Sequence, residues 1–102
     1  MPYVLSNRAD ADLDEILAYS LKTFGEANAE VYFLSLRDCL HALADNPGMG
    51  QAVDDLHPGL RRHHHRRHAI YYVIEQPGIF VVRVLHQSMD APRHLGSDSN
   101  SR

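Results

Sequence analysis

The sequence predicts an α+β fold in which a helical hairpin packs on a small, mainly antiparallel β-sheet. Before Gly59 apolar side chains recur at steps of three and four, which is typical of one face of a helix, and after Gly59 they alternate, as in a strand. At 102 residues the chain fits one domain. We expect this domain to span residues 1–95 and the small, polar residues 96–102 to form a disordered tail.

The first half predicts a short strand followed by two helices. Tyr3–Leu5 is an apolar run ahead of Ser6, a residue type that caps helices. The spacing predicts helices over Asn7–Phe24 and Glu26–Asp45, separated by Gly25, which suits the end of a helix. Two helices joined by so short a break should lie antiparallel, with Tyr3–Leu5 as an edge strand of the sheet.

The second half predicts three strands and a short C-terminal helix. The strands are expected over Leu60–His64, His68–Glu75 and Ile79–His86, with a tight turn at Gln76-Pro77-Gly78 between the last two. Pro92 follows the last strand, and its fixed φ suits the first turn of a helix.

Both faces of the last two predicted strands are apolar. Strict alternation on the final strand places Phe80, Val82 and Val84 on one face and Ile79, Val81, Arg83 and Leu85 on the other. A half-solvated antiparallel sheet normally alternates apolar with polar residues, and one helical hairpin covers one face. We therefore expect a second copy or a partner segment to cover the other face, which Arg83 interrupts.

The net charge of −3 is unevenly distributed along the chain. Residues 1–58 carry ten acidic and three basic side chains, a net charge of −7, whereas residues 59–102 carry seven arginines and three acidic side chains, a net charge of +4. Guanidinium groups are favoured where a carboxylate or a phosphate is held in a fixed geometry. Charge alone leaves two alternatives open: the halves neutralise each other, or the basic half binds an acidic partner.

No stretch approaches the ~18 consecutive apolar residues of a membrane-spanning helix, and the N-terminus lacks the regions of a signal peptide. The only cysteine, Cys39, cannot form an internal disulfide, and its place among leucines suits a buried thiol. We expect a cytoplasmic protein without a membrane partner.

The most unusual stretch is the arginine- and histidine-rich run Arg61–His68. Adjacent histidines on a strand point to opposite faces and cannot converge on one ion, and the four arginines would repel a divalent cation, so we expect no metal. Phosphate binding, with Tyr71 and Tyr72 as stacking partners, and a solvated hairpin both remain open, and the solvated hairpin is favoured for the histidines.

A second polar group, Arg83, His86, Asp90 and His94, lies near the end of the last predicted strand. Arginine, histidine and a carboxylate would suit acid–base cleavage of RNA. The alternative, which we favour, is that Arg83 pairs with an acidic group and His86 only closes the strand. Because no glycine-rich phosphate loop or nucleophile motif is present, we expect no cofactor.

A series of short motifs resembles the ParE toxins of the RelE/ParE superfamily. In the first half the motifs are Tyr3-Val4-Leu5-Ser6, Asp12-Leu13 and Phe24-Gly25, together with Ala9, Ile16, Tyr19, Ala29 and Tyr32. In the second half they are Pro58-Gly59-Leu60-Arg61, His68-Ala69-Ile70-Tyr71-Tyr72, Arg83-Val84-Leu85-His86, Met89-Asp90 and His94-Leu95. The motifs follow the family's order and spacing over about residues 2–95.

The resemblance implies the same helical hairpin on a small sheet. It also implies the toxin of a type II toxin–antitoxin system, neutralised by a ParD-like antitoxin and inhibiting DNA gyrase by binding, not by catalysis. The runner-up is a ribosome-dependent mRNA endoribonuclease of the RelE kind, carried by Arg61, Arg83 and His86. A third alternative is an interaction module that has lost its toxicity. We expect no direct sequence-specific binding of nucleic acid.

The expected partner-binding residues lie on the basic run, the last two strands and the C-terminal segment. They are Arg61, Arg62, Arg66, Arg67, Tyr72, Arg83, Met89, Arg93 and Leu95. The arginines would meet Asp or Glu of the antitoxin, and Met89 and Leu95 would form an adaptable apolar side. In the family the C-terminal region is tied to toxicity and to antitoxin contact. The alternative is that this segment caps the core, with Leu95 packed against the sheet.

Overall fold

The computed structural model describes residues 2–89, 91–93 and 95, so the predicted tail at 96–102 lies outside the described residues. The elements are β1 (Tyr3–Leu5), α1 (Asn7–Phe24), α2 (Glu26–Asp45), a 3-10 turn (Pro47–Met49), β2 (Gln51–Ala52), β3 (Leu60–His65), β4 (His68–Glu75) and β5 (Gly78–His86). Residues 91–93 and 95 are helical, as expected for the short C-terminal helix.

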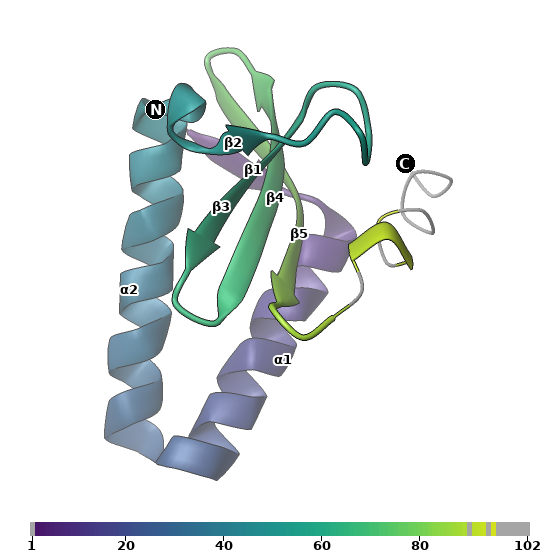
Figure 1. Ribbon diagram of the computed structural model, residues 1–102. Helices are drawn as coiled ribbons and strands as arrows, with labels where there is room; N and C mark the ends of the chain where they lie inside the picture. Colours follow the sequence, from purple (N-terminus) through teal and green to yellow (C-terminus); the bar gives the residue numbers. More distant parts are fainter. Residues whose placement is uncertain (1, 90, 94, 96–102) are drawn as a thin grey trace.

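The helical hairpin has the predicted bounds. The Ser6 hydroxyl accepts a hydrogen bond from the Ala9 N–H at 2.9 Å, which satisfies one free donor of the first turn of α1. Gly25 separates the helices with φ +86°, a left-handed value that favours glycine. The helices spread apart from this joint (Figure 1). No helix among the described residues is both long enough and apolar enough to span a bilayer.

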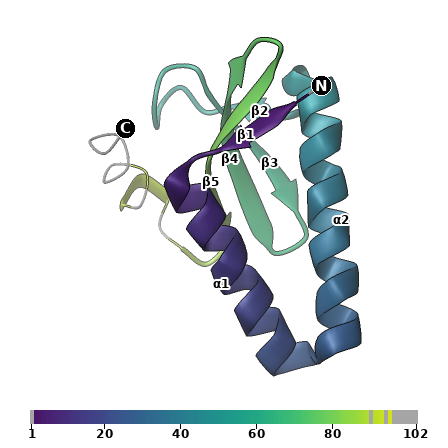
Figure 2. The same ribbon diagram turned by 180° about the vertical axis from the view of Figure 1, so that it is seen from behind.

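The five strands form one mixed sheet in the order β1-β5-β4-β3-β2. β1 pairs with β5 in parallel and all other pairs are antiparallel, which confirms the predicted α+β class with an N-terminal edge strand. The turn between β3 and β4 points toward the joined end of the helical hairpin (Figures 1 and 2).

A β-bulge at Val82 changes which face the end of β5 presents. Tyr71 pairs with Arg83 but Tyr72 pairs with Val81, so Val82 is an extra residue on β5. Val84 therefore joins Ile79 and Val81 in the core beneath the helices. Val82 and Leu85 belong to the opposite face. The faces predicted for Val84 and Leu85 were wrong, because strict alternation assumes an uninterrupted ladder.

The larger core lies between the helices and one face of the sheet. Its least exposed large side chains come from α2 (Leu36, Leu40 and Leu43), β4 (Ile70 and Tyr72) and β5 (Ile79 and Val81). Apolar burial of this kind is the main favourable term in folding.

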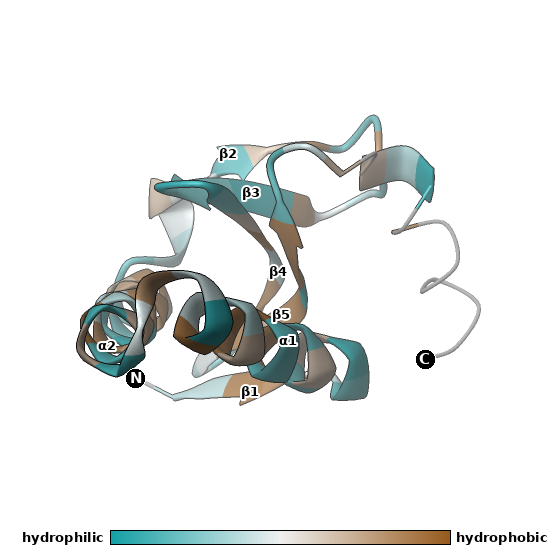
Figure 3. Ribbon diagram, turned by 90° about the horizontal axis from the view of Figure 1, so that it is seen from below, coloured by the Kyte–Doolittle hydropathy of each residue, from teal (hydrophilic) through white to brown (hydrophobic). Residues whose placement is uncertain are grey.

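The second face of the sheet is partly covered by the chain itself. Val53 and Leu56, which follow β2, pack on it, and so do Ala91 and Leu95 of the C-terminal segment. Figure 3 shows these segments on the side of the sheet opposite the helices. We predicted that a second copy or a partner covers this face, and for this part of the face the prediction was wrong. Apolar residues of the loop after β2 and of the helical C-terminal segment supply the cover instead.

Candidate functional site

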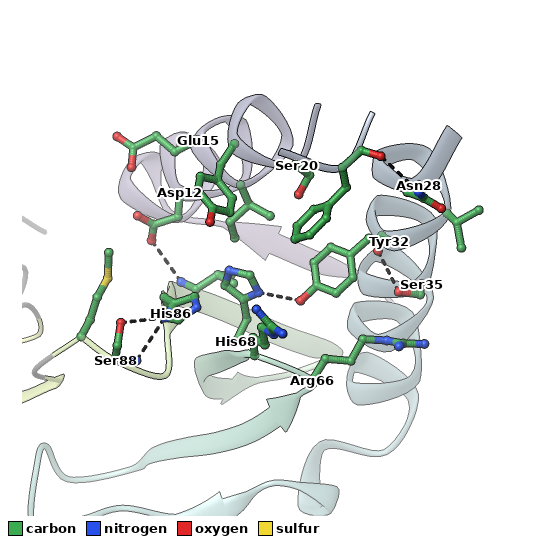
Figure 4. Close-up of a pocket in the computed structure, with 17 residues that line it drawn as sticks. Asp12, Glu15, Ser20, Asn28, Tyr32, Ser35, Arg66, His68, His86 and Ser88 are labelled. Atoms are coloured by element: carbon green, nitrogen blue, oxygen red, sulfur yellow. Dashed lines mark hydrogen bonds between the residues drawn. The ribbon is translucent and has the colours of Figure 1, made fainter. Parts of the chain in front are cut away.

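A groove of about 770 Å³ opens between the joined end of the helical hairpin and the nearby end of the sheet (Figure 4). Its walls come from four parts of the chain. They are α1 (Asp12, Glu15, Ile16, Tyr19, Ser20 and Phe24), α2 (Asn28, Val31, Tyr32 and Ser35), the β3–β4 turn region (Arg66, Arg67 and His68), and the end of β5 with the residues after it (Val84, His86, Ser88 and Met89).

The helical side of the groove exposes large apolar side chains. Tyr19, Phe24 and Val31 are 63%, 51% and 68% exposed. The rings of Tyr19 and Phe24 meet edge to face with their centroids 6.4 Å apart. Exposed aromatic side chains that line a concave surface are typical of protein-binding sites, because a partner can bury them completely.

The opposite side carries two arginines at the β3–β4 turn. Both Arg66 and Arg67 are exposed. Arg66 has φ 55°, a left-handed conformation that residues other than glycine and asparagine seldom adopt. The positive charges of Arg66 and Arg67 favour ionisation of the Tyr32 hydroxyl, but burial outweighs them and raises the Tyr32 pKa.

Two histidines attach this turn to α2. The Ser35 hydroxyl donates to the Tyr32 carbonyl at 2.7 Å, so the Nε2–H of His65 is the donor in the 3.0 Å contact with Ser35 Oγ. A 2.5 Å hydrogen bond joins the Tyr32 hydroxyl to Nδ1 of His68. These contacts hold the base of the turn, and therefore the two arginines, beside the groove.

His68 is uncharged near neutral pH. Burial, followed by the positive charge of His86 and of His65 when protonated, lowers the pKa of His68 to about 4. The pKa of His65 is also lowered, first by burial and then by Arg66. Near neutral pH, His65 and His68 therefore add little positive charge beside Arg66 and Arg67.

His86 lies next to His68, with the ring centroids 5.4 Å apart. Its Nδ1 accepts a hydrogen bond from the Ser88 N–H at 3.1 Å and lies 2.7 Å from Ser88 Oγ. Because Nδ1 is an acceptor, the proton of neutral His86 resides on Nε2. His86 therefore ends β5 and also lines the groove.

Arg83 is buried in an ion pair with Asp12 of α1. Its Nε and Nη2 donate to the Asp12 carboxylate at 2.7 and 2.8 Å, and the Val84 N–H donates to the same carboxylate at 3.0 Å. The two side chains are 9% and 10% exposed. This confirms the alternative in which Arg83 pairs with an acidic group, and it leaves the Arg83 guanidinium enclosed.

The three residues of the predicted endoribonuclease centre do not come together. Arg61 donates to the carbonyls of Gly50 and Gly48, at 2.6 and 3.3 Å, near the start of β3. It pairs across the sheet with Tyr72, whereas His86 pairs with His68. Tyr72 and His68 are four positions apart on β4, which is about 13 Å along the strand.

The other predicted partner-binding residues differ in exposure. Tyr72 is 0% exposed, and its hydroxyl donates to the Pro47 carbonyl and accepts from the Gly50 N–H, at 2.6 and 2.9 Å. Arg62 is half-buried and Arg93 is exposed. Leu95 is 7% exposed and packs in the second core, as in the alternative that the C-terminal segment caps the sheet.

Met89 is 44% exposed and lines the groove with Arg66 and Arg67, so three of the predicted partner-binding residues share one surface. The sequence analysis did not identify Tyr19 and Phe24 as site residues, because their spacing is typical of an ordinary amphipathic helix. The pairing of His65 with His68 could have been predicted from the sequence, because a two-residue turn at Arg66-Arg67 places these two histidines opposite each other. Within the described part of the chain, no three His, Cys, Asp or Glu side chains could hold a metal.

Comparison with known proteins identifies the family. Residues 3–91 match the family model described as ParE toxin of type II toxin-antitoxin system, parDE. Toxin ParE1 of Caulobacter vibrioides is 42% identical over 95 residues, which cover 93% of this chain and 98% of that protein. Toxin ParE1 of Mycobacterium tuberculosis is 39% identical over 94 residues, covering 91% and 96%.

The fold also matches a solved structure. A chain of the chromosomal ParDE TA system from P. aeruginosa superposes with a TM-score of 0.72 at 20% identity, covering 84% of this chain and 95% of that one. Residues 3–91 match the family model, and this chain covers nearly the whole length of relatives that are about 40% identical to it. The chain therefore belongs to the ParE toxin family of type II toxin–antitoxin systems.

Proposed function

We propose that a ParD-like antitoxin neutralises this toxin by placing a segment in the groove, and that the free toxin inhibits DNA gyrase by binding. The observation that carries the proposal is the groove itself, in which the exposed apolar side chains Tyr19, Phe24 and Val31 face the arginines of the β3–β4 turn. Burial of the apolar side chains would supply most of the affinity, and the arginines would speed association with an acidic segment.

The groove is a better antitoxin site than the second sheet face. On that face Val53, Leu56 and Leu95 already bury much of the apolar surface. Arg83, one of the predicted antitoxin contacts, is already paired with Asp12. The structure of this fold from P. aeruginosa belongs to a chromosomal ParDE system, which supports a ParD-type partner for this chain.

The gyrase-binding surface is proposed to begin at the rim of the groove. Met89 lines the groove, and the chain continues into the helical residues 91–93, where Pro92 and Arg93 are exposed. An antitoxin segment in the groove would cover Met89. One surface would then serve both partners, and the antitoxin would neutralise the toxin by competition.

A supercoiling assay with purified gyrase tests the target. We expect the chain to inhibit supercoiling and the variant Met89→Asp with Arg93→Glu to lose inhibition. The variant Arg37→Glu, a substitution at an exposed position of α2 outside the groove, should inhibit like the unmodified chain. All three substituted side chains are exposed, so each variant should fold with nearly unchanged stability. Full inhibition by the Met89/Arg93 variant would place the site elsewhere, with the Arg61–His68 hairpin as the next candidate.

RNA cleavage is the competing function. The separation of Arg61 from His86 and the burial of Arg83 favour binding over cleavage by these three residues. We expect the His86→Ala variant to remain toxic, because we do not propose a catalytic role for His86. If His86 were a catalytic histidine, its loss would lower the cleavage rate by ~10²–10⁴-fold. Primer extension on mRNA from expressing cells checks this: discrete cuts that disappear with His86→Ala would favour the endoribonuclease.

A further inference from the structure

We propose that the outer edge of β1 is a self-association surface, at which two copies of the chain pair antiparallel about Val4 and join their sheets. This surface lies apart from the groove, because no residue of β1 lines the groove. The inference therefore goes beyond the proposed function, and its test needs neither the antitoxin nor gyrase.

β1 is the outermost strand on one side of the sheet. Among the described residues it pairs only with β5, and Figure 3 shows it at the border of the sheet. The Ser6 N–H donates to the Val81 carbonyl at 2.9 Å, and the Ile79 N–H donates to the Pro2 carbonyl at 3.3 Å. Pro2 and Ser6, at the two ends of β1, therefore direct backbone groups toward β5.

The backbone groups of β1 alternate between its two edges. Residues two apart on a strand direct their N–H and C=O groups to the same side, so Val4 also faces β5. The N–H and C=O groups of Tyr3 and Leu5 consequently point away from β5, along the outer edge. These are the groups that a further strand would bind.

The two borders of the sheet differ in how they are protected. Native proteins protect a free strand edge by keeping it very short or by placing charge, proline or a bulge on it. β2, at the opposite border, is two residues long and is followed closely by Asp54 and Asp55. β1 carries no charged side chain, and Val4, its one exposed residue, is 59% exposed. The edge of β1 is therefore suited to pairing with another strand.

The geometry of this edge favours a second copy over an unrelated segment. In an antiparallel pair centred on Val4, the outward groups of Tyr3 lie opposite those of Leu5 in the second copy. A two-fold axis forms both sets of hydrogen bonds at once, because the same surface is used twice. The two Val4 residues become the non-hydrogen-bonded pair on the axis, in which side chains approach most closely.

This pairing would also bury apolar surface on the second face of the sheet. Val4 lies beside Phe80 of β5, which is half-buried. Neither residue belongs to the group that the loop after β2 and the C-terminal segment cover. In the joined sheet these two side chains and their copies would form one apolar strip across the axis, and burial of that strip favours association.

Sedimentation equilibrium of the free full chain measures the association. A pair of three-residue strands buries less than the ~1,200 Å² of a stable interface, so we expect a Kd on the order of 10–100 µM. Val4→Lys places like charges opposite each other on the axis and should raise the Kd at least about tenfold. The matched control Val4→Thr keeps a β-branched side chain without charge and should raise it much less.

Disulfide trapping tests the register directly. In Val4→Cys with Cys39→Ala, the paired Cα atoms would lie about 4.5 Å apart, within disulfide range, so mild oxidation should yield a covalent dimer. The control Val31→Cys with Cys39→Ala places a thiol at a comparably exposed position on α2 and should cross-link far more slowly. Circular dichroism checks that each variant folds.

The outcomes separate this inference from the proposed function. A free chain that stays monomeric up to about 500 µM would show the inference wrong, and an extended partner segment would then be the alternative occupant of the edge. A dimer that persists in Val4→Lys, or equal cross-linking rates at positions 4 and 31, would also overturn it, because another surface would then join the copies. Val4→Lys should still inhibit supercoiling, since Val4 is outside the groove.

Discussion

Replacement of Arg83 by methionine should destabilise the protein without removing an exposed contact. The guanidinium donates to the Asp12 carboxylate through Nε and Nη2 at 2.7 and 2.8 Å. Methionine approximates the length of the aliphatic part of the side chain but offers no donor. The Asp12 carboxylate then keeps only the Val84 N–H, at 3.0 Å, among these three donors.

The expected loss of stability follows from the burial of the Arg83–Asp12 ion pair. Both side chains of the pair are no more than 10% exposed, so solvent screens the pair weakly. Loss of one partner from a buried pair costs about 3–5 kcal/mol, because the remaining charge is left without compensation. For a domain of this size that corresponds to a fall in Tm of roughly 12 °C or more. This loss is also a large part of the free energy of unfolding of a typical native protein, which is ~5–15 kcal/mol.

Urea unfolding followed by circular dichroism measures the free energy of unfolding of Arg83→Met, Asp12→Leu and the double variant. The double variant removes both charges, so its loss should be smaller than the sum of the two single losses. Its remaining cost comes mainly from the Val84 N–H, about 1–3 kcal/mol for an unpaired buried donor. A loss below about 1 kcal/mol for Arg83→Met, or simple additivity, would refute the reasoning.

Three further predictions follow from single contacts. Tyr72→Phe leaves the Gly50 N–H and the Pro47 carbonyl unpaired and should cost about 1–3 kcal/mol in urea unfolding, whereas Tyr71→Phe on the other face should cost less; equal losses would contradict this. Ser6→Ala removes the cap of α1 and a 2.6 Å hydrogen bond to the Val82 carbonyl, so its Tm should fall by several degrees, while Asn7→Ala, one position later, serves as the control. The pKa of His68 in the folded state is about 4, below its ordinary 6.5, so the contribution of neutral His68 to stability is present above pH 6.5 and is lost as pH falls through 4. The His68→Gln variant should therefore show a flatter dependence of the unfolding free energy on pH between 4 and 6.5. An unchanged slope would exclude His68 as the cause of this pH dependence.

The helices could be predicted because their signals are local. Ser6 lies where a cap is needed, Gly25 lies where a left-handed residue is needed, and the apolar period runs unbroken between them. Ser6 and Gly25 mark the two ends of α1 and the start of α2, and Asn46-Pro47 marks the end of α2. Tertiary packing then agreed with the local signals, and the predicted bounds were confirmed.

The sheet faces were only partly predictable, because one extra residue reverses the pattern. Nothing in the alternating apolar run of β5 marks Val82 as a bulge, since valine suits either face. The cover of the second face was equally hidden. Val53 and Leu56 are isolated apolar residues in a polar loop, and their packing on the sheet depends on contacts distant in sequence.

The candidate site was predicted in fragments. Arg66, Arg67 and Met89 do share a surface, but Tyr72 and Arg83 are held inside the fold by hydrogen bonds that no local pattern announces. The groove arises because the hairpin turn reaches the joined end of the helices, which is a property of the assembled layers. Partner contact by Arg66, Arg67, Met89 and the other predicted residues stays a prediction.

The pairing of β1 with β5 has a consequence for the order of events during synthesis. The first strand of the chain finds its partner only in the last strand, and Asp12 finds its partner in Arg83, 71 residues later. The groove likewise needs residues from Asp12 to Met89. Because a chain emerges from the ribosome N-terminus first, the groove cannot form before Met89 has been synthesised. An antitoxin segment of the kind proposed above would therefore find a complete groove only after the chain has been synthesised as far as Met89.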